Sequence, residues 1–516
     1  MKRASGIAVV PARGSPAPGR QWPTTPRGWH AGPSPGVLRT PRPPASVGRT
    51  MDPPARCGRA KRVGPPSRWP GEARARANAL PPGLAVLALS LSWAAQPPAV
   101  ASGQVLTSVE FSFSNPGARS MGFGGAFVAL ADDATAAFAN PAGLIQLSEP
   151  EVSIEGRLWR YSTPYTTGGR AAGEPTGLGI DTADAPLRGE STAQLGGLAF
   201  VSLVYPVGDW SFAFYQHQLL NFEMTQEIQG IFASGPGITG VWRGPIERGF
   251  FDLEITTRAL AAGRRVGDRL SLGFAAAYFE PSTHVFGEEY RPDDDTAEAF
   301  FAAASFLPER LVDRVSIAIP AGDWGLAAGF LWNVASEWKL GGVYRQGPEL
   351  AFEGALTAGP AHPQLPAGER VFLGSSPWRL PDVYGLGVAY RSRDGHWAAG
   401  LEWDRVEYST VIESLGELAS PGDTLDDADE LHLGGEYAFF VGASVVAVRL
   451  GAWHDPDHQV RNETGGPIVR AELVGGADEL HVAAGVGIAL GKLQVDLGID
   501  LSRRRDAGSL SVICAF

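Results

Sequence analysis

Apolar and polar side chains alternate along most of the chain after Pro150. The stretch from Leu493 to Leu501, LQVDLGIDL, has an apolar side chain at every odd position and Gln, Asp, Gly and Asp between them. A period of two is typical of a β-strand with one apolar and one polar face, because successive side chains of a strand point to opposite sides. The chain is therefore predicted to be all-β.

Fourteen segments are predicted as strands, and short turns alternate with long polar loops between them. Val207-Gly208 and Gly491 are examples of the turns, and 163–193 and 284–322 are examples of the loops. An even number of antiparallel strands with short connections on one side and long ones on the other is typical of an outer-membrane barrel. The predicted strands are 151–162, 194–206, 209–222, 249–262, 269–283, 323–334, 337–353, 382–392, 396–411, 429–440, 443–454, 478–490, 492–503 and 508–516.

Several features favour a membrane barrel over a soluble β-sandwich, which would also alternate but would bury its apolar face. Many segments have about ten residues or more, enough to cross a bilayer at a tilt. Leu510, Val512, Cys514 and Phe516 end the chain in a pattern that resembles the C-terminal signal of bacterial outer-membrane proteins. Aromatic residues near strand ends fit the girdles of such barrels; they are Trp210, Trp324, Trp338, Tyr344, Tyr390 and Trp397. We therefore predict a 14-stranded antiparallel transmembrane β-barrel, occupying residues 151–516, in a bacterial outer membrane.

The chain before the barrel divides into three parts. Residues 1–75 are basic and rich in Pro and Gly, a composition that predicts disorder. A start codon assigned too early explains this segment better than an RNA-binding tail. Residues 76–101 read as a signal peptide, because a short apolar run is followed by the cleavage pattern Ala99-Val100-Ala101. Residues 102–150 remain as a separate segment ahead of the barrel.

Charge and cysteine content limit the partners of the main body. Residues 79–516 hold 28 Lys and Arg against 53 Asp and Glu, which argues against a nucleic-acid partner. Cys57 and Cys514 are the two cysteines, so no disulfide framework is expected. No run of about 18 apolar residues follows Ala101, so no transmembrane helix is expected in the mature chain.

A stretch rich in Gly and Ala, from Asn115 to Gln146, lies directly before the first strand. A phosphate-binding loop is ruled out here, because the third glycine of G-x-G-x-x-G is missing and no G-K-[ST] follows. Asp132-Asp133 are expected to cap a short helix beginning near Ala134, and Asn140-Pro141 to end it. A compact segment of small residues suits a plug, because the lumen of a 14-stranded barrel is too wide for side chains alone to fill.

The same stretch, GARSMGFGGAFVALADDATAAFANPAGL, resembles the N-terminal hatch of the FadL-type outer-membrane transporters of long-chain fatty acids and hydrocarbons. Further similar stretches are DWGLAAGFLWNVASEWKLGGVYR (323–345), LPDVYGLGVAYR (380–391) and LEWDRVEYS (401–409), so that the resemblance extends over roughly 103–516. It implies an N-terminal plug inside the lumen. The implied hatch residues are Gly122, Gly124, Gly125, Asp132, Asp133, Asn140, Pro141 and Ala142.

The resemblance also implies a mechanism, in which outer loops capture a hydrophobic ligand and a shift of the hatch releases it. Exit is then sideways into the bilayer, through a kink in the third strand, 209–222. Gln216 and Gln218 interrupt the apolar row of that strand, and His217 lies on its other face. A gap or bulge is expected there. The alternative is that both glutamines lie near the outer interface, and no Gly or Pro marks a kink.

Apolar loop residues are candidates for the capture surface, and loop-on-loop packing is the alternative for each of them. They are Phe232, Ile238, Trp242, Phe300 and Phe301. The expected partners are a hydrophobic small-molecule ligand, outer-membrane lipids and lipopolysaccharide, and the barrel-assembly machinery.

Other groups of residues give weaker evidence of a function. Asp-Glu-Leu-His occurs at 429–432 and at 478–481; a metal site is conceivable, but solvated, hydrogen-bonded lumen residues are favoured and no metal is predicted. Asp293-Asp294-Asp295 is read as a solvated loop rather than a cation site. No G-x-S-x-G motif occurs, so a membrane lipase is disfavoured and no catalytic residue or cofactor is predicted. A barrel that serves as a scaffold or shuttle in protein secretion is the main alternative function.

Overall fold

The structure is a computed structural model that describes residues 113–516, apart from 236–237, 293–295, 417–418 and 474. The side chains of Ile238, Thr239 and Ala297 are also not described. The predicted disordered segment, the signal peptide and the acidic run Asp293-Asp294-Asp295 lie outside the described residues.

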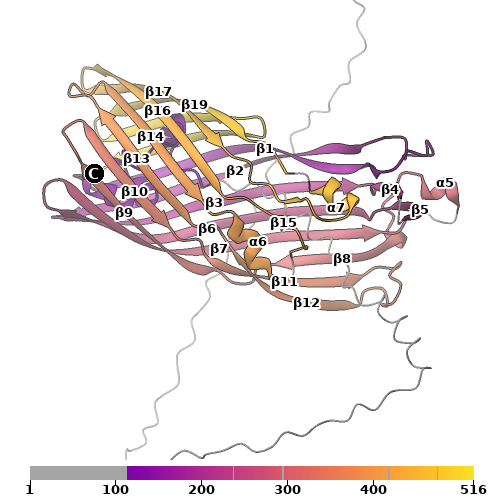
Figure 1. Ribbon diagram of the computed structural model, residues 1–516. Coiled ribbons are helices and arrows are strands. Elements are labelled where there is room, and N and C mark those ends of the chain that lie inside the picture. The colour runs from indigo at the N-terminus through magenta and orange to yellow at the C-terminus, as the bar shows by residue number, and fades with distance from the viewer. Residues whose placement is uncertain (1–112, 236–237, 293–295, 417–418, 474) are drawn as a thin grey trace, which may run out of the picture. The chain divides into compact units, whose positions relative to one another are not determined.

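Fourteen antiparallel strands close into a barrel (Figure 1), which confirms the prediction of fold and strand number. Each strand pairs with the next one in the series, and the last pairs with the first from Glu151↔Ala515 to Tyr161↔Arg505. The strands are β1 (Glu151–Ala172), β2 (Pro186–Val207), β3 (Trp210–Ile228), β6 (Ile246–Val266), β7 (Leu270–Tyr290), β9 (Asp323–Asn333), β10 (Trp338–Arg345), β13 (Val383–Arg391), β14 (Trp397–Val406), β16 (Ala428–Val441), β17 (Ser444–Asp455), β19 (Glu479–Leu490), β20 (Leu493–Leu501) and β21 (Arg505–Ala515).

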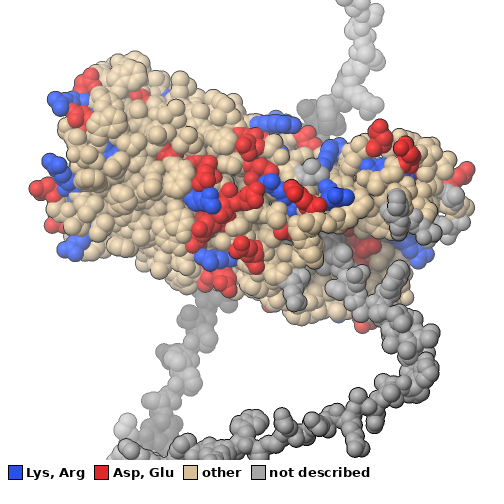
Figure 2. Space-filling view, viewed as in Figure 1, with Lys and Arg blue, Asp and Glu red and all other residues tan. Residues whose placement is uncertain are grey.

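The two faces of the wall follow the alternation of the sequence. In β20, Leu497 is 50% exposed on the outer face, whereas its neighbour Asp496 is fully buried on the inner face. Large apolar side chains are exposed in this way on strands all around the barrel. Figure 2 shows the result on one side: an uncharged surface between charged groups at the turn end, on the left, and a charged belt across the middle. Such a band suits a hydrocarbon environment rather than water.

The strands on one side of the barrel are longer than the sequence pattern suggested. β1 and β2 remain paired as far as Gly169↔Pro186, so that much of the predicted loop 163–193 is an extension of the hairpin. The predicted single strand 337–353 is divided, because Gly347-Pro348 interrupts it. Three further strands pair in the order β7–β8–β11–β12 beyond the barrel wall. They are β8 (Leu311–Ala318), β11 (Glu349–Ala358) and β12 (Arg370–Arg379).

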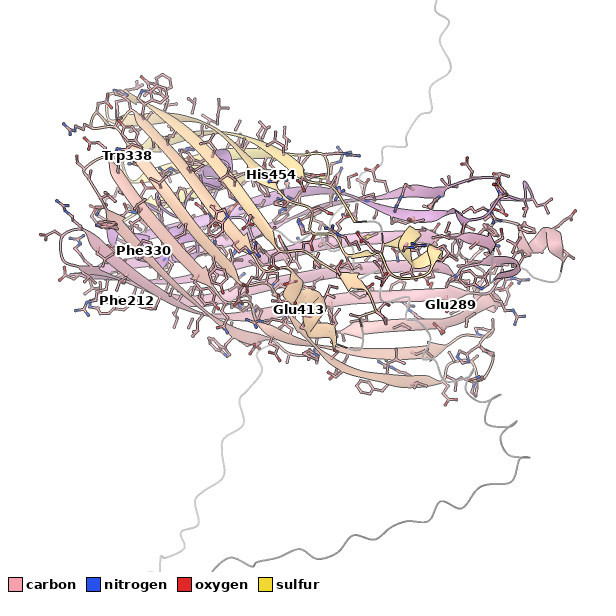
Figure 3. All side chains as sticks on the ribbon, in the orientation of Figure 1. Phe212, Glu289, Phe330, Trp338, Glu413 and His454 are labelled. Atoms are coloured by element: carbon pink, nitrogen blue, oxygen red, sulfur yellow. The ribbon has the colours of Figure 1, made fainter. Side chains whose placement is uncertain are left out.

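Short helices and strands lie in the long loops, at the end of the barrel opposite the short turns. None of the described helices has the length and apolar character needed to cross a membrane. In Figure 3, Phe212, Phe330 and Trp338 lie on the turn half of the barrel, whereas Glu413 and Glu289 lie on the loop half. The loop elements are β4 (Phe232–Gly235), β5 (Ile238–Arg243), α5 (Ala297–Phe300), η2 (Pro308–Arg310), α6 (Ser409–Leu415), β15 (Asp423–Thr424), β18 (Arg461–Asn462) and α7 (Pro467–Glu472).

The segment before β1 fills the lumen as a hatch, as predicted. It contains α3 (Ala118–Gly122), α4 (Ala136–Ala139) and the 3-10 helix η1 (Pro141–Gln146). The expected cap is wrong in detail, because α4 begins at Ala136 after Thr135 and has no side-chain cap. The carboxylate of Asp133 instead accepts hydrogen bonds from the backbone N–H and the hydroxyl of Thr135, at 2.9 and 2.5 Å. A local Asx-type turn has replaced the first turn of the expected helix.

Candidate functional site

The hatch meets the barrel wall through backbone, because glycines of the inner face leave room for it. A Cβ atom built on Gly273 of β7 would lie 2.1 Å from the Ala142 nitrogen, and one on Gly451 of β17 would lie 2.3 Å from the Gly124 nitrogen. Both distances are too short for any side chain, so these positions require glycine. Other wall glycines in contact with the hatch backbone are Gly263, Gly341, Gly400, Gly434, Gly485 and Gly498, and Gly329 faces the side chain of Asn140.

The glycines predicted for the hatch have the matching role on its own side. Gly124 and Gly125 have φ angles of +69° and +82°, in the left-handed region that favours glycine. Gly122 packs on Gly485, where an added Cβ would lie 2.7 Å from the Gly485 Cα. A Cβ on Gly125 would meet the His432 ring at 2.8 Å. These residues let the chain turn tightly against the wall.

Asn140 joins three parts of the structure. Its side-chain amide donates to the carbonyl of Val128 in the hatch at 2.9 Å, and to the carbonyl of Phe330 in β9 at 3.0 Å. Its side-chain oxygen accepts from the Ala142 N–H at 3.1 Å and caps η1, in which Pro141 occupies the first turn. Asn140 is fully buried. The Asn-Pro-Ala tripeptide therefore ends α4, begins η1 and fastens both to the wall.

Arg119 is the centre of a buried ion network between hatch and wall. Its guanidinium lies 2.6 Å from Asp132, 3.3 Å from Asp133 and 3.2 Å from Glu436 of β16. Arg391 of β13 also pairs with Asp132. Burial acts to raise the pKa of Asp132, but the guanidinium groups of Arg119 and Arg391 outweigh it and hold this pKa well below its usual value. The pKa of Asp133 is raised by its burial, despite Arg119.

The ladder between β2 and β3 breaks halfway along the strands. The two strands pair from Val207↔Trp210 to Phe200↔His217. Beyond this point β2 continues with β1 alone and β3 continues with β6 alone, and one hydrogen bond of 2.9 Å from the Thr225 N–H to the Ser191 hydroxyl links them again. The wall has lost its regular backbone pairing between these two places.

The break lies at the residues predicted for a lateral exit. β3 has a register shift between Gln218 and Leu220 against β6. A Cβ on Gly197 of β2 would lie 3.2 Å from the Gln218 side-chain oxygen, so this glutamine lies beside a strand that presents no side chain there. Gln216 contacts Arg258, which pairs with Glu280. The outer face of the wall is therefore polar at this height.

His217 points inward and marks the place where the hatch approaches the break. Its ring lies 4.4 Å from the ring of Phe138 in α4 and 5.9 Å from the ring of Phe200. The Tyr215 ring lies 6.1 Å from that of Phe138 and stacks on Phe200 at 5.9 Å. Aromatic contacts thus link α4 of the hatch to β3 directly, and to Phe200 of β2 through Tyr215 and His217.

An apolar cavity adjoins this aromatic contact. With the hatch in this position its volume is about 40 Å³. Phe113, Phe138 and Tyr215 contribute aromatic surface, and Leu219 and Phe279 extend it. Arg345 of β10 supplies the cationic group of the lining, with its guanidinium 4.9 Å over the Phe138 ring. Its Nε and Nη1 are buried without a hydrogen-bond partner among the described residues.

Most of the predicted capture residues pack against one another. Phe232 of β4 is fully buried, with its ring 5.7 Å from that of Phe301 and 6.2 Å from that of Phe300. The Arg243 guanidinium lies 5.3 Å over the Phe232 ring and binds the Phe300 carbonyl at 2.8 Å. This is loop-on-loop packing. Trp242 is 48% exposed, whereas the side chain of Ile238 is outside the described residues.

The two Asp-Glu-Leu-His stretches lie on either side of one strand, β17. The rings of His432 in β16 and His481 in β19 both stack on the ring of Trp453, which lies between them in β17. The ring centroids are 5.1 and 3.9 Å from that of Trp453. The two histidines are 4% and 1% exposed. The expectation of hydrogen-bonded residues is confirmed, but the expectation that they are solvated is wrong, because the hatch covers His432 and Asp455, Asp500 and Trp453 enclose His481.

Sequence reasoning missed the partners that the wall contributes to the hatch. Glu402 of β14 is fully buried and accepts from the Val128 N–H at 2.7 Å. Glu155 of β1 accepts from the Gly117 N–H at 2.7 Å. Both are inward positions of predicted strands, so the alternation identified their face. The residue that each would meet depends on how the hatch lies, which no local pattern records.

Comparison with known proteins shows which solved structures share this fold. Neither the family models nor the curated proteins compared with the sequence match it. Among solved structures, a FadL homologue from Pseudomonas aeruginosa is 18% identical, with a TM-score of 0.54 over 79% of this chain and 100% of that one. A second structure, the CymD monoaromatic hydrocarbon channel, is 15% identical, with a TM-score of 0.48 over 79% of this chain and 99% of that one. The chain thus has the fold of FadL homologues.

Proposed function

We propose that this chain is an outer-membrane transporter for the passive uptake of hydrophobic small molecules, such as long-chain fatty acids or hydrocarbons. One observation carries the proposal: a barrel with an apolar outer surface holds a latched hatch, and an apolar cavity lies directly against that hatch. A general porin needs an open lumen, which this hatch occupies. Pockets lined by apolar and aromatic side chains suit apolar ligands.

The proposed route has three stations. Exposed apolar groups of the outer loops, Trp242 among them, capture the ligand. A shift of the hatch then widens the cavity beside Phe138 for the ligand, and Arg345 offers a positive charge there to ligands that carry an acid group. It leaves sideways into the bilayer through the break between β2 and β3, where the absence of a side chain at Gly197 leaves space. Outer-membrane lipids contact the apolar band.

Uptake of labelled compounds tests the proposal. The chain is expressed in cells that lack their own FadL-type transporter, and entry of a long-chain fatty acid, an alkylbenzene and a small sugar is compared. We expect entry of at least one apolar compound and no gain for the sugar. Entry of none of them, from a barrel shown to be folded in the outer membrane, would contradict the proposal and favour a role in protein secretion.

A larger side chain at Gly197 is expected to slow exit. In Gly197→Phe, the ring would fill the space beside Gln218, and a passing ligand would have to displace it. Overpacking of this kind costs about 1–3 kcal/mol, which corresponds to roughly a 5- to 150-fold lower uptake rate. The measurement is the initial rate of entry of the compound that the native chain carries.

Gly435→Phe is the matched control for this change. Gly435 also belongs to a barrel strand, β16, but an added Cβ meets no atom within 4 Å there. We expect native uptake from this control, with both variants showing the shift in gel mobility on heating that marks a folded barrel. Equal uptake by Gly197→Phe and the native chain would remove the lateral route from the proposal.

A further inference from the structure

Two buried carboxylates on neighbouring strands lie directly opposite each other. The register of β14 and β16 pairs Asp404 with Glu430 and Glu402 with His432. Asp404, Glu430 and His432 are 7%, 8% and 4% exposed. Like charges in such positions destabilise a sheet, and burial increases the cost. Among the described residues, neither Asp404 nor Glu430 forms an ion pair with Lys or Arg, so the positive charge between them comes from a metal ion or from a proton on His432.

The spacing of the three side chains suits a metal ion. The His432 Nε2 lies 3.3 Å from a carboxylate oxygen of Glu430 and 3.8 Å from one of Asp404. One ligand atom from each residue lies within 4.8 Å of the other two. Ligands that hold a tetrahedral ion at about 2.0–2.2 Å lie roughly 3.4 Å apart. Small side-chain movements would therefore complete the coordination.

The other nitrogen of His432 is oriented as in a metal-bound histidine. Nδ1 lies 2.9 Å from the carbonyl oxygen of Gly124 in the hatch and donates to it. In the neutral ring this leaves a lone pair on Nε2 that a metal ion can accept, whereas a protonated ring donates its Nε2–H to Glu430 at 3.3 Å. Histidine ligands commonly donate their second N–H to a backbone carbonyl, which fixes tautomer and orientation. Stacking on Trp453 within 15° of parallel also fixes the ring plane.

Asp404 faces His432 with its Oδ2, and its other oxygen, on the side of Gly385, is incompletely satisfied. Its Oδ1 is buried and has no hydrogen-bond partner among the described residues. An unsatisfied buried carboxylate oxygen costs free energy unless a ligand, proton or ion satisfies it.

We propose that Asp404, Glu430 and His432 bind a first-row divalent cation such as Zn²⁺, which braces the hatch through the Gly124 contact of His432. One imidazole nitrogen and two carboxylate oxygens suit Zn²⁺ or Mn²⁺, whereas Ca²⁺ and Mg²⁺ take oxygen ligands alone. The site is structural and does not depend on what the barrel transports. Its third ligand, Asp404, comes from a strand outside the Asp-Glu-Leu-His stretch.

The second Asp-Glu-Leu-His stretch provides a control residue, His481, for the variant of His432. Both ring nitrogens of His481 face carboxylates: Nδ1 lies 3.0 Å from Asp500 and Nε2 lies 3.7 Å from Asp455. This arrangement fits a protonated ring between two anions. Asp455 also contacts His458 at 3.3 Å. His481→Gln therefore removes a buried histidine on the same ring of Trp453 and leaves the proposed metal ligands in place.

The test measures metal content directly. The untagged full chain is extracted from outer membranes in detergent, stripped with a chelator and dialysed against micromolar Zn²⁺, and bound metal is measured by mass spectrometry. The variants are His432→Gln, Asp404→Asn and Glu430→Gln, with His481→Gln as the control. A shift in gel mobility on heating establishes that each barrel is folded, and the temperature of that shift is a second readout.

We expect about one Zn²⁺ per barrel in the native chain and in His481→Gln. Each ligand variant that folds should bind at least about 100-fold more weakly, since even the loss of an indirect partner costs 10- to 100-fold. Added Zn²⁺ should raise the unfolding temperature of the native chain, and equal Ca²⁺ should not. Absence of bound Zn²⁺ from the native chain, or equal binding by the folded Asp404→Asn and Glu430→Gln variants, would overturn the proposal and leave a proton between these groups.

Discussion

Replacing Asn140 with alanine is expected to release the hatch from the wall. The change removes the donor to the part-buried carbonyl of Phe330 in the wall, and within the hatch it removes the donor to Val128 and the acceptor of the Ala142 N–H. Only the Phe330 contact joins hatch and wall, and its loss costs up to about 1–3 kcal/mol. Each 1.4 kcal/mol is about a factor of ten in an equilibrium. The displaced hatch should therefore be populated roughly 5- to 150-fold more often.

Conductance of single barrels in planar bilayers measures this effect, and the entry of a bulky hydrophilic antibiotic measures it in cells. Both should rise in Asn140→Ala. Asn462→Ala is a matched control, because Asn462 is also buried and makes several hydrogen bonds, to Pro421, Asp423 and Gly465, but lies in the loops. The control should remain closed. A closed, folded Asn140→Ala barrel would show that Asn140 does not latch the hatch.

Replacing Arg119 with methionine is expected to have an effect of similar size, by a different route. The variant leaves Asp132, Asp133 and Glu436 as buried carboxylates with fewer cations near them. Removal of one partner from a buried ion pair destabilises a protein by about 3–5 kcal/mol, because an uncompensated charge remains. The measurement is the denaturant concentration at which the hatch becomes open to protease in a barrel that is still folded.

The pH dependence of the stability of Arg119→Met follows from the direction in which the Asp132 pKa is shifted. In the native chain the Asp132 pKa lies below its unfolded value, so its contribution to stability is fully present above that value and does not change between pH 7 and pH 5. Without Arg119 the same pKa is expected to rise. Acid would then neutralise the buried charge, and the deficit of the variant should shrink as the pH falls over this interval.

Arg393→Met is the control for this second experiment. Arg393 also pairs with a glutamate, Glu337, but its side chain is 82% exposed. Exposed ion pairs contribute little to stability, so the hatch should remain protected. A hatch equally protected in Arg119→Met at pH 7 would mean that the ion network does not hold it.

The barrel itself could be predicted because each strand records its own orientation. Alternation shows which residues face lipid, and it needs no knowledge of any other strand. The alternation does not show where a strand leaves the membrane, because β1 and β2 remain paired well past the predicted strand ends. Predicted loops such as 163–193 therefore proved to contain strand. The break at Gly347-Pro348 was visible in the sequence but was overridden by the apolar pattern on either side.

The sites depend on contacts between segments that are distant in the chain, and this is where sequence reasoning stopped. Glu430 and His432 are two residues apart, so alternation places them on one face, but Asp404 joins them only through the register of β14 against β16. Phe232 was apolar and in a loop, which fits capture and packing equally; the ring of Phe301 decides for packing. Asp133 had a good position for a helix cap, and Thr135 offered it a closer donor.

The glycines of the wall also limit which parts of this protein are interchangeable. Gly273, Gly451 and their counterparts follow the outline of one particular backbone, that of the hatch. A hatch with a different course would meet side chains where it needs glycine, and would leave gaps where the wall now makes contact. Hatch and wall must therefore change together during evolution, so a graft of either one onto a relative requires the matching glycine positions as well.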